Sequence, residues 1–306
     1  MFTPLDAYLQ LPKAPHPWVV EKLIPMSGLV NCFGKPKTGK SFFALGLAQA
    51  IVNGDADWQG YPIQQHGPVA YLQIDTPREE WHSRLGKLNF QPQGSRTLWM
   101  ADMWQVPEFP FNILNPQRTE VRWLKESLAA INPVLTIIDT LREVHGGDEN
   151  DSTTMRNVLA ELVGACRPSA ILLLSHARKD SILTTNGEDD LMDQGRGSSY
   201  VAGRMDVVIK LTPKRMVFKG RATGQTVETI AQDPNTGLIV VEPGPNDRAV
   251  NDELRSVLAD LGPNASQRAV ATELSKRTRT SLSTAIRRYA AYTKEHSTPH
   301  VNPEHP

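Results

Sequence analysis

The chain has 306 residues, enough for one large domain with a buried core and a small domain beside it. Its apolar fraction of 40% and charged fraction of 22% are typical of globular proteins, and it has no apolar run of about 18 residues, so we expect no membrane segment. The 33 basic and 33 acidic residues balance, which excludes a polycation of the histone type and requires any nucleic-acid surface to arise from local clustering.

The N-terminal stretch lacks the basic and apolar regions of an export signal, so we expect a cytoplasmic protein. The two cysteines, Cys32 and Cys166, have no metal-ligand spacing and lie in or beside apolar segments. They are therefore expected to be reduced thiols in the core.

The first informative motif is FGKPKTGKSFFALG at residues 33–46, which fits the pattern G-x-x-x-x-G-K-[ST] from Gly34 to Ser41. The apolar run 29–33 before it predicts a strand, and the 3.6-residue apolar spacing over 42–52 predicts a helix. A strand before the glycine loop and a helix after it are the context that a phosphate-binding P-loop requires.

In such a loop the backbone amides of 35–41 and the positive end of the following helix face phosphate oxygens. Lys40 is expected to reach the β- and γ-phosphates of ATP, and the Ser41 hydroxyl is expected to bind Mg²⁺. The residues expected to contact the nucleotide are Gly34, Lys37, Thr38, Gly39, Lys40, Ser41 and Phe42.

The second predicted strand, 68–74, is followed directly by Asp75. A carboxylate at this place can orient or deprotonate the water that attacks ATP, with Glu79 and Glu80 as substitutes one turn later. Asp75 can equally be the N-cap of the next helix, before Pro77, and the residues leave both roles open.

Further along the chain, the apolar pattern predicts strands at 97–101, 134–139 and 170–175 and a helix over 118–131. The last two strands are continuously apolar, as expected of parallel strands covered on both faces. The run 134–139 ends in Asp139, where a P-loop protein needs a carboxylate to hold the water shell of Mg²⁺, the Walker B position. An aspartate that merely starts a turn is the alternative, and the preceding P-loop favours the metal role.

Beyond residue 205, four short apolar segments separated by turn residues predict an antiparallel extension of the mainly parallel sheet. The segment PGPND at 243–247 is the best linker in the chain. We therefore predict an α/β P-loop ATPase domain over 1–245 and a small helical domain over 246–306 that ends in a disordered polar tail.

The order of these motifs resembles that of the RecA-like ATPases and, among them, the hexameric plasmid RepA-type helicases and related AAA-type ATPases of phages and plasmids. Four stretches carry the resemblance: GKPKTGKS (34–41), YLQIDTP (71–77), IIDTLREVHGGDENDSTTMRNVL (137–159) and LLLSHARKD…RGSSYVAGRMDVVIKL (172–211). The last two are more specific than the P-loop, because few other P-loop classes have an "ENDS" loop or an "RGSS" segment there. The resemblance covers roughly residues 15 to 240 and implies a RecA-like fold.

The resemblance also implies a ring, usually of six subunits, that binds ATP and Mg²⁺ between neighbours. By position, Lys40 and Ser41 match the phosphate and Mg²⁺ residues, and Asp139 matches Walker B. Asp75 falls where these families usually have a catalytic glutamate, and its shorter side chain implies slower turnover. His176 matches the polar residue that senses the γ-phosphate, with a hydrogen-bonded strand-end histidine as the alternative.

Ring ATPases of this kind complete the site with a cation from the adjacent subunit, which stabilises charge in the transition state. Lys219 and Arg221, in VFKGRATG, match the K-x-R position of RecA-like helicases, and Arg196 and Arg204 are competitors. A solvated surface pair is the alternative for Lys219 and Arg221.

In the resembling fold, two loops face a central channel and contact DNA. The first, 142–153, is acidic and a poor phosphate binder, whereas the second, 178–198, offers Arg178, Lys179 and Arg196. The mixed charge of the second loop leaves the strength of DNA binding open.

Helices predicted at 251–261, 267–276 and 281–295, with a turn at 277–280, fit a helix-turn-helix. Seven basic residues and one acidic residue lie between 266 and 294, which favours DNA binding, with a solvated appendage or a protein-docking module as the alternative. The residues expected to meet DNA phosphates here are Arg277, Arg279, Arg287 and Arg288.

We therefore expect an ATPase motor that acts on DNA, chiefly single-stranded, as a homo-oligomeric ring with replication or recombination proteins as partners. A replicative helicase is the leading version, and a phage-type recombination or strand-annealing ATPase is the close alternative. A nucleotide-dependent loader or regulator that binds a protein partner instead of DNA is favoured by the acidic 142–153 loop and the zero net charge, and opposed by the basic C-terminus.

Overall fold

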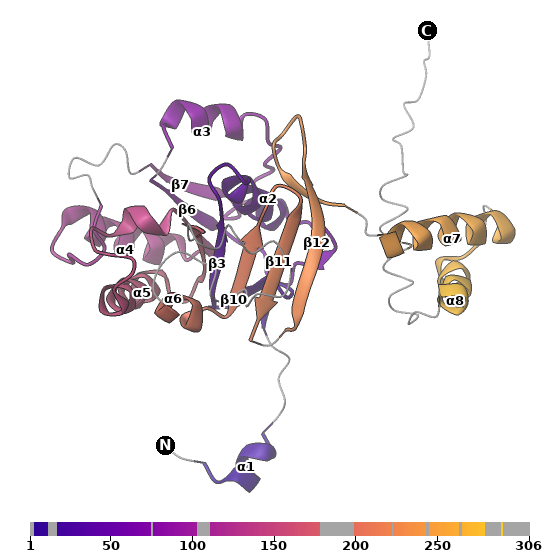
Figure 1. Ribbon diagram of the computed structural model, residues 1–306, viewed down its shortest axis with the longest axis horizontal. Coiled ribbons are helices and arrows are strands. Elements are labelled where there is room, and N and C mark those ends of the chain that lie inside the picture. The colour runs from indigo at the N-terminus through magenta and orange to yellow at the C-terminus, as the bar shows by residue number, and fades with distance from the viewer. Residues whose placement is uncertain are drawn as a thin grey trace. The chain divides into compact units, whose positions relative to one another are not determined.

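In the computed structural model, the chain forms two units, Met1–Val241 and Glu242–Pro306 (Figure 1). Each unit is described by itself. The sequence had predicted this boundary at residue 245. The structure describes residues 3–11, 17–74, 76–102, 111–177, 199–221, 223–242, 245–262, 265–278 and 289.

One nine-stranded sheet organises the first unit, with the strand order β13-β12-β11-β10-β3-β9-β8-β6-β7. The pairs from β10 through β3, β9, β8 and β6 to β7 are parallel, and those from β10 through β11 and β12 to β13 are antiparallel. Its strands are β3 (Leu29–Gly34), β6 (Val69–Gln73), β7 (Leu98–Asp102), β8 (Leu135–Asp139), β9 (Ala170–His176), β10 (Val207–Leu211), β11 (Arg215–Gly220), β12 (Gln225–Gln232) and β13 (Ile239–Val241). The predicted α/β fold with a mainly parallel sheet is confirmed.

One detail of the predicted antiparallel extension is wrong. Strand β10 runs parallel to β3, in register from Val207 opposite Val30 to Leu211 opposite Gly34. The antiparallel part therefore begins at β11, because a tight connection returns the chain beside β10. Strand β10 consequently extends the parallel layer on the side of the P-loop strand.

Helices cover both faces of the sheet, which explains why β3, β6 and β8 are buried along their whole length. Helix α2 lies in one apolar cluster with the β1–β2 and β4–β5 hairpins, whereas α4, α5 and α6 share a second cluster and lie side by side in Figure 1. The remaining elements of the unit are α1 (Leu5–Leu9), β1 (Trp18–Val20), β2 (Ile24–Pro25), α2 (Lys40–Asn53), β4 (Asp57–Trp58), β5 (Tyr61–Pro62), α3 (Arg78–Leu85), α4 (Thr119–Ile131), η2 (Leu141–Val144), α5 (Ser152–Cys166) and α6 (Ser199–Arg204).

One expectation about the core is confirmed. Cys32 and Cys166 are free and buried, and burial raises the pKa of both thiols, that of Cys166 to about 12. Among the helices within the described ranges, none combines the length and apolarity needed to cross a membrane.

Aromatic side chains join the antiparallel strands to helix α2. Phe43 on α2 meets Trp58 edge-on with ring centroids 5.2 Å apart. Trp58 in turn contacts the ring of Tyr61, and Tyr61 contacts the ring of Phe218 on β11. Phe43 and Phe218 are fully buried. The late antiparallel strands are thus part of the main core, and they help to hold the helix that follows the P-loop.

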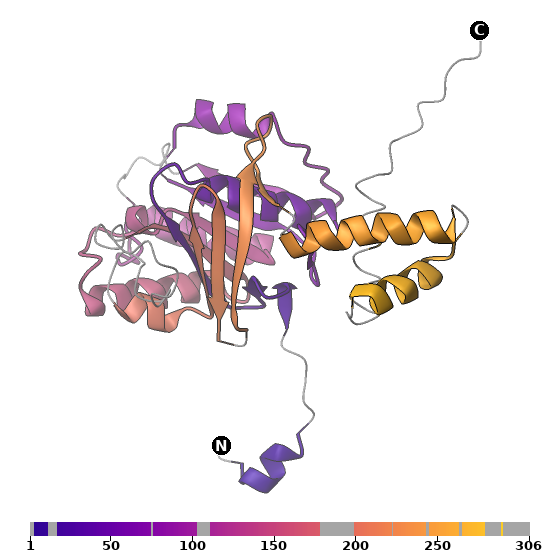
Figure 2. The ribbon, with the colours of Figure 1, turned by 45° about the vertical axis from the view of Figure 1, so that its right-hand side comes forward.

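The second unit contains two packed helices, α7 (Pro245–Leu261) and α8 (Gln267–Thr278), which form an antiparallel pair in Figure 2. Their core consists of Leu254, Val257, Val270, Ala271 and Leu274, and Tyr289 packs against it.

The predicted boundaries of these helices need two corrections. Helix α7 begins at Pro245, inside the predicted linker 243–247, because proline is compatible with the first turn of a helix. Helix α8 runs to Thr278, so the turn predicted at 277–280 does not begin at Arg277. The third predicted helix, 281–295, lies outside the described residues except for position 289, and the helix-turn-helix stays a prediction.

We predict that Phe218→Ala destabilises the first unit by about 3–5 kcal/mol, because it empties a fully buried ring site in the aromatic chain. Val227→Ala on the neighbouring strand β12 is the matched control: its side chain is 54% exposed, and we expect a change within about 0.5 kcal/mol. Urea unfolding of both variants measures the difference. Equal stability of the two would contradict a shared core.

Candidate functional site

The carboxyl ends of the central parallel strands meet at one edge of the sheet. Gly34 at the end of β3 lies opposite His176 on β9, and Asp139 on β8 lies between Leu174 of β9 and Gln73 of β6. Residues that are far apart in the sequence are therefore neighbours here, and the predicted P-loop leaves the sheet at this edge.

The P-loop has a conformation that its glycines permit. Gly39 adopts φ +89°, and Lys37 also lies in the left-handed region at φ 64°. Gly34 is tightly enclosed: a Cβ atom there would lie 2.5 Å from the carbonyl oxygen of Leu211 and 2.7 Å from Oγ1 of Thr38. The loop can therefore approach β10 closely only with glycine at position 34.

Lys40 lies inside this loop, with 7% of its surface exposed. Its Nζ donates to the carbonyl oxygens of Gly34 at 3.2 Å and Lys35 at 3.0 Å. Helix α2 begins at this residue, and its N-cap, Gly39, offers no side chain to the first amides of the helix. A buried ammonium group beside uncapped helix amides is the chemistry that fits phosphate oxygens.

A hydroxyl group joins the two predicted metal-binding residues. The Tyr71 hydroxyl, on β6, donates to Oδ2 of Asp139 at 2.8 Å and also forms a side-chain hydrogen bond with Ser41. Tyr71 is fully buried, and burial, together with the charge of Asp139, raises its pKa well above the usual value. The oxygen donors of Ser41 and Asp139 are thus close together, and hard oxygen ligands suit Mg²⁺.

Sequence reasoning missed Tyr71. The signal was a phenol within an otherwise apolar run, PVAYLQI, where a buried hydroxyl needs a hydrogen-bonding partner. That signal alone does not name the partner, because Tyr71 and Asp139 are 68 positions apart.

The side chain of Phe42 packs within the first unit. Its ring packs against the turn before β13, since a Cβ on Gly237 would lie 2.6 Å from it, and the Arg84 guanidinium stands 5.3 Å from its centroid. Ile239 of β13 similarly covers Gly39. The Phe42 side chain is therefore engaged in packing, and its backbone amide is what it can offer a nucleotide.

The predicted catalytic carboxylate, Asp75, lies outside the described residues. Its alternative role as a helix N-cap is wrong, because the N-cap of α3 is Pro77. Of the two substitutes, Glu80 forms an ion pair with Arg84 on its own helix, and Glu79 is exposed.

His176 ends β9 next to the start of the P-loop. The amide of Ala177 donates to the carbonyl oxygen of Gly34 at 3.2 Å, which fixes the end of this strand on the loop. The histidine is half-buried at that place.

Arg221 lies at the end of the β11 segment and binds the end of helix α6. Its Nε donates to the carbonyl oxygen of Met205 at 3.1 Å, and its Nη2 donates to that of Gly203 at 2.6 Å. Nε also lies 3.8 Å from Oδ1 of Asp206. These contacts place its charge at a helix C-terminus, where a cation is favourable. Arg204, a competing candidate, is exposed.

The K-x-R pair lies at the opposite edge of the sheet from the P-loop of the same chain. Asp206, beside Arg221, accepts a hydrogen bond from the amide of Leu29 at 2.9 Å, and Leu29 is the first residue of β3. The P-loop leaves from Gly34 at the other end of that strand. Lys219 is exposed at the same edge as Arg221.

The acidic loop 142–153 is structured by its own residues. Asp151 is the N-cap of α5: its carboxylate accepts from the amides of Thr153 at 3.2 Å and Thr154 at 2.8 Å, and the hydrogen bonds with Thr154 lower its pKa. His145 is buried, and this burial, with the charge of Arg142, lowers its pKa. Part of the acidity of the loop therefore serves helix capping.

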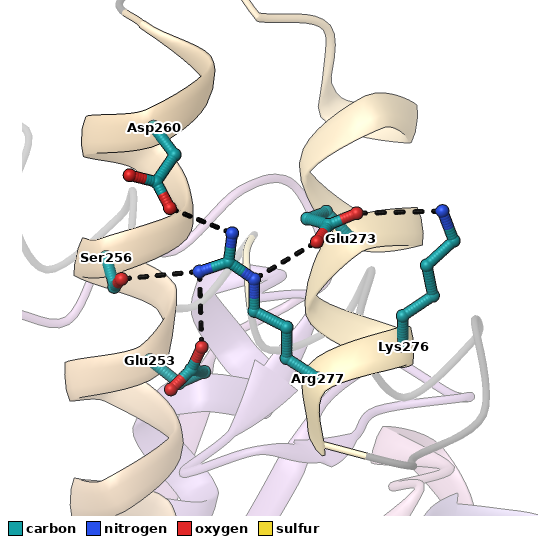
Figure 3. Close-up of polar contacts among 6 residues, drawn as sticks. All are labelled: Glu253, Ser256, Asp260, Glu273, Lys276 and Arg277. Atoms are coloured by element: carbon teal, nitrogen blue, oxygen red, sulfur yellow. Dashed lines mark hydrogen bonds and ion pairs between the residues drawn. The ribbon is translucent and has the colours of Figure 1, made fainter.

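Arg277, one of the predicted DNA contacts, is bound within the second unit. Figure 3 shows its guanidinium between the two helices, where Nη2 contacts Asp260 at 2.8 Å, Nη1 contacts Glu253 at 3.3 Å and Nε contacts Glu273 at 3.1 Å. Nη1 also donates to Ser256 at 3.3 Å. All three nitrogens have partners, so the prediction that Arg277 presents its charge to phosphates conflicts with the structure.

The predicted excess of basic residues between 266 and 294 does not extend to α7, which contains four acidic and two basic residues. Helices α7 and α8 together contain five acidic and five basic residues. The other residues predicted to contact DNA lie outside the described ranges: Arg178, Lys179, Arg196, Arg279, Arg287 and Arg288.

The sheet order and the P-loop edge define a RecA-like P-loop ATPase. A family model described as "AAA domain" matches residues 1–181, and the chain belongs to this family of AAA ATPases.

A solved structure described as an "ATPase Domain" is similar with a TM-score of 0.51 at 15% identity, over 70% of this chain and 84% of that one. "The Structure Of A DnaB-Like Replicative Helicase And Its Interactions With Primase" is similar with a TM-score of 0.54 at 13% identity, over 77% and 66%. At such identities the likeness establishes the fold, and it confirms the predicted RecA-like class.

We predict that Gly34→Ala destabilises the protein by about 1–3 kcal/mol and weakens nucleotide binding at least tenfold, because the new methyl group would meet a backbone carbonyl that cannot move aside. Gly164→Ala on α5 is the control: beyond its chain neighbours and the backbone of its own helix, a Cβ atom there would meet no atom within 4 Å, and alanine should stabilise the helix by about 0.5–1 kcal/mol. Urea unfolding and fluorescent-nucleotide titration measure both. Wild-type binding by Gly34→Ala would refute the tight cradle.

We predict that Arg277→Gln loosens the α7–α8 pair, so that backbone amides of α7 and α8 exchange hydrogen several-fold faster at low salt. Lys276→Gln is the matched control, because Lys276 is 71% exposed and pairs at 3.6 Å with Glu273 of its own helix. Hydrogen exchange followed by mass spectrometry measures both variants. Unchanged exchange together with weaker, less salt-dependent DNA retention would instead support the phosphate contact.

Proposed function

We propose that the chain binds ATP with Mg²⁺ in the P-loop and hydrolyses it. The observation that carries this proposal is the convergence of Lys40, Ser41 and Asp139 at one sheet edge, beside a loop in which only glycine fits at position 34. Membership of the AAA domain family supports nucleotide use.

The roles follow from the contacts. Lys40 exchanges the carbonyl oxygens of Gly34 and Lys35 for oxygens of the β- and γ-phosphates, while the first amides of α2 bind the same phosphates. Ser41 and Asp139 hold Mg²⁺, which when bound neutralises charge on the phosphate oxygens. Asp75 orients the attacking water, and His176 senses the γ-phosphate from the end of β9.

The proposed enzyme is an oligomeric ring, of six subunits as in the RepA-type helicases. Lys219 and Arg221 lie at the start of β3, whereas the P-loop lies at its end, so these cations act on the nucleotide of a neighbouring subunit. This arrangement requires Arg221 to leave the carbonyl groups of Gly203 and Met205 when the neighbour binds ATP.

We further propose that the motor acts on single-stranded DNA in the cytoplasm as a replicative helicase-type ATPase, together with replication proteins. The likeness of the fold to the DnaB-like replicative helicase supports this reading. Recombination or strand annealing is the alternative use of the same core. The DNA contacts are assigned to the 178–198 loop and to the helix-turn-helix module.

A nucleotide-dependent loader or regulator is the second candidate function. The charge balance of α7 and α8, and the engagement of Arg277 with three carboxylates, favour a module that docks on a protein. This candidate shares the ATP site and differs in what the hydrolysis serves.

We predict that the purified chain hydrolyses ATP, that single-stranded DNA stimulates the rate several-fold, and that Lys40→Ala lowers the rate about 100-fold or more by removing the phosphate-binding ammonium group. Phosphate release with and without DNA measures this. Salt-dependent DNA retention should be lost in a chain that ends at Glu242.

Two results would contradict parts of the proposal. Lys40-dependent hydrolysis that is indifferent to DNA would establish the loader or regulator instead of the DNA motor. Nucleotide binding without hydrolysis, under all conditions and with partner proteins added, would reject the motor reading.

A further inference from the structure

Tyr71 occupies a position between the two residues to which the proposed function assigns Mg²⁺, and the following inference rests on that function. It is fully buried on β6, opposite Ile137 of β8, so its phenol extends along the sheet to Asp139, two residues further along β8. The hydroxyl bonds to Asp139 at 2.8 Å and also to Ser41. One oxygen atom therefore links the P-loop helix to the Walker B strand.

The direction of these hydrogen bonds follows from the number of protons. A phenol has one O–H donor, and an ionised carboxylate can only accept, so the Tyr71 proton is directed to Oδ2 of Asp139. The bond with Ser41 must then run the other way, with the serine hydroxyl donating to the phenol oxygen. As a result the lone pairs of Ser41 Oγ are turned away from the phenol oxygen, where they are available to a metal ion.

The ring itself is held in place by its neighbours. Trp81 of α3 meets Tyr71 edge-on with ring centroids 4.9 Å apart, and the Arg84 guanidinium stands 5.4 Å from the Trp81 ring. These contacts restrain the ring, so the position of the hydroxyl does not depend on its two hydrogen bonds alone.

We propose that Tyr71 is a positioning residue that orients Ser41 and Asp139 for Mg²⁺ and so sets the affinity of the site for the metal–nucleotide complex. The phenol touches neither ATP nor the metal. It acts through the two oxygen ligands, as outer partners of metal ligands do.

The test compares two substitutions that each remove one buried hydroxyl. Tyr71→Phe retains the ring and its contact with Trp81 and removes the hydroxyl between Ser41 and Asp139. Tyr61→Phe is the matched control: its hydroxyl bonds to Glu228 on β12, outside the P-loop edge. Urea unfolding checks that both variants are folded.

Equilibrium binding of a non-hydrolysable ATP analogue is measured for each protein with Mg²⁺ and with EDTA. We expect Tyr71→Phe to bind the analogue about 10-fold or more weakly in Mg²⁺, within the range for lost outer partners of metal ligands, and like wild type in EDTA. The Mg²⁺ concentration for half-maximal binding should rise accordingly. Tyr61→Phe should match wild type in both conditions.

The outcomes separate this inference from the proposed function. Wild-type Mg²⁺ dependence in Tyr71→Phe would overturn the positioning role and leave the ATPase proposal intact. An equal loss with Mg²⁺ and with EDTA would also overturn it, because a general defect of the P-loop is not metal-specific. Failure of the wild-type chain itself to bind the analogue would instead reject the proposed function.

Discussion

The parallel register of β3, β9, β8 and β6 is the constraint on which the candidate site depends. It aligns Gly34 with His176 and Asp139 with Gln73, so that segments from four parts of the chain end together. A slip of one residue would turn each side chain to the other face of the sheet, and it would separate buried partners such as Ser175 of β9 and Asn31 of β3, whose side chains hydrogen-bond at 2.8 Å. The geometry of the site is therefore maintained by packing and hydrogen bonding of side chains that are buried along the strands.

The sequence predicted what local patterns determine. Strand β3, helix α2 and strand β8 are recognisable from apolar periodicity, and the glycine loop and Asp139 follow from where those runs end. The sequence did not predict which hydroxyl meets Asp139, because that contact joins strands separated by 68 positions through a sheet order that no local pattern contains. The parallel pairing of β10 was missed for the same reason.

Cations were the least predictable residues, since their role depends on which acceptors the fold brings near. From the sequence, Arg221 and Arg277 were both expected to be surface charges available to another molecule. The structure instead places Arg221 on the carbonyl groups at the end of α6, and Arg277 among three carboxylates of α7 and α8. A count of charges along the chain cannot distinguish such internal pairs from an open surface, because it ignores the residues that face them.

The turn before β13 and the strand itself pack against the P-loop helix. Gly237 packs on Phe42 and Ile239 packs on Gly39, so this strand rests directly on the beginning of the P-loop helix. The same strand ends at Val241, where the first unit ends. The residue that covers Gly39 therefore lies three positions before Glu242, the first residue of the second unit, so the strand that ends the first unit also closes the start of its P-loop helix.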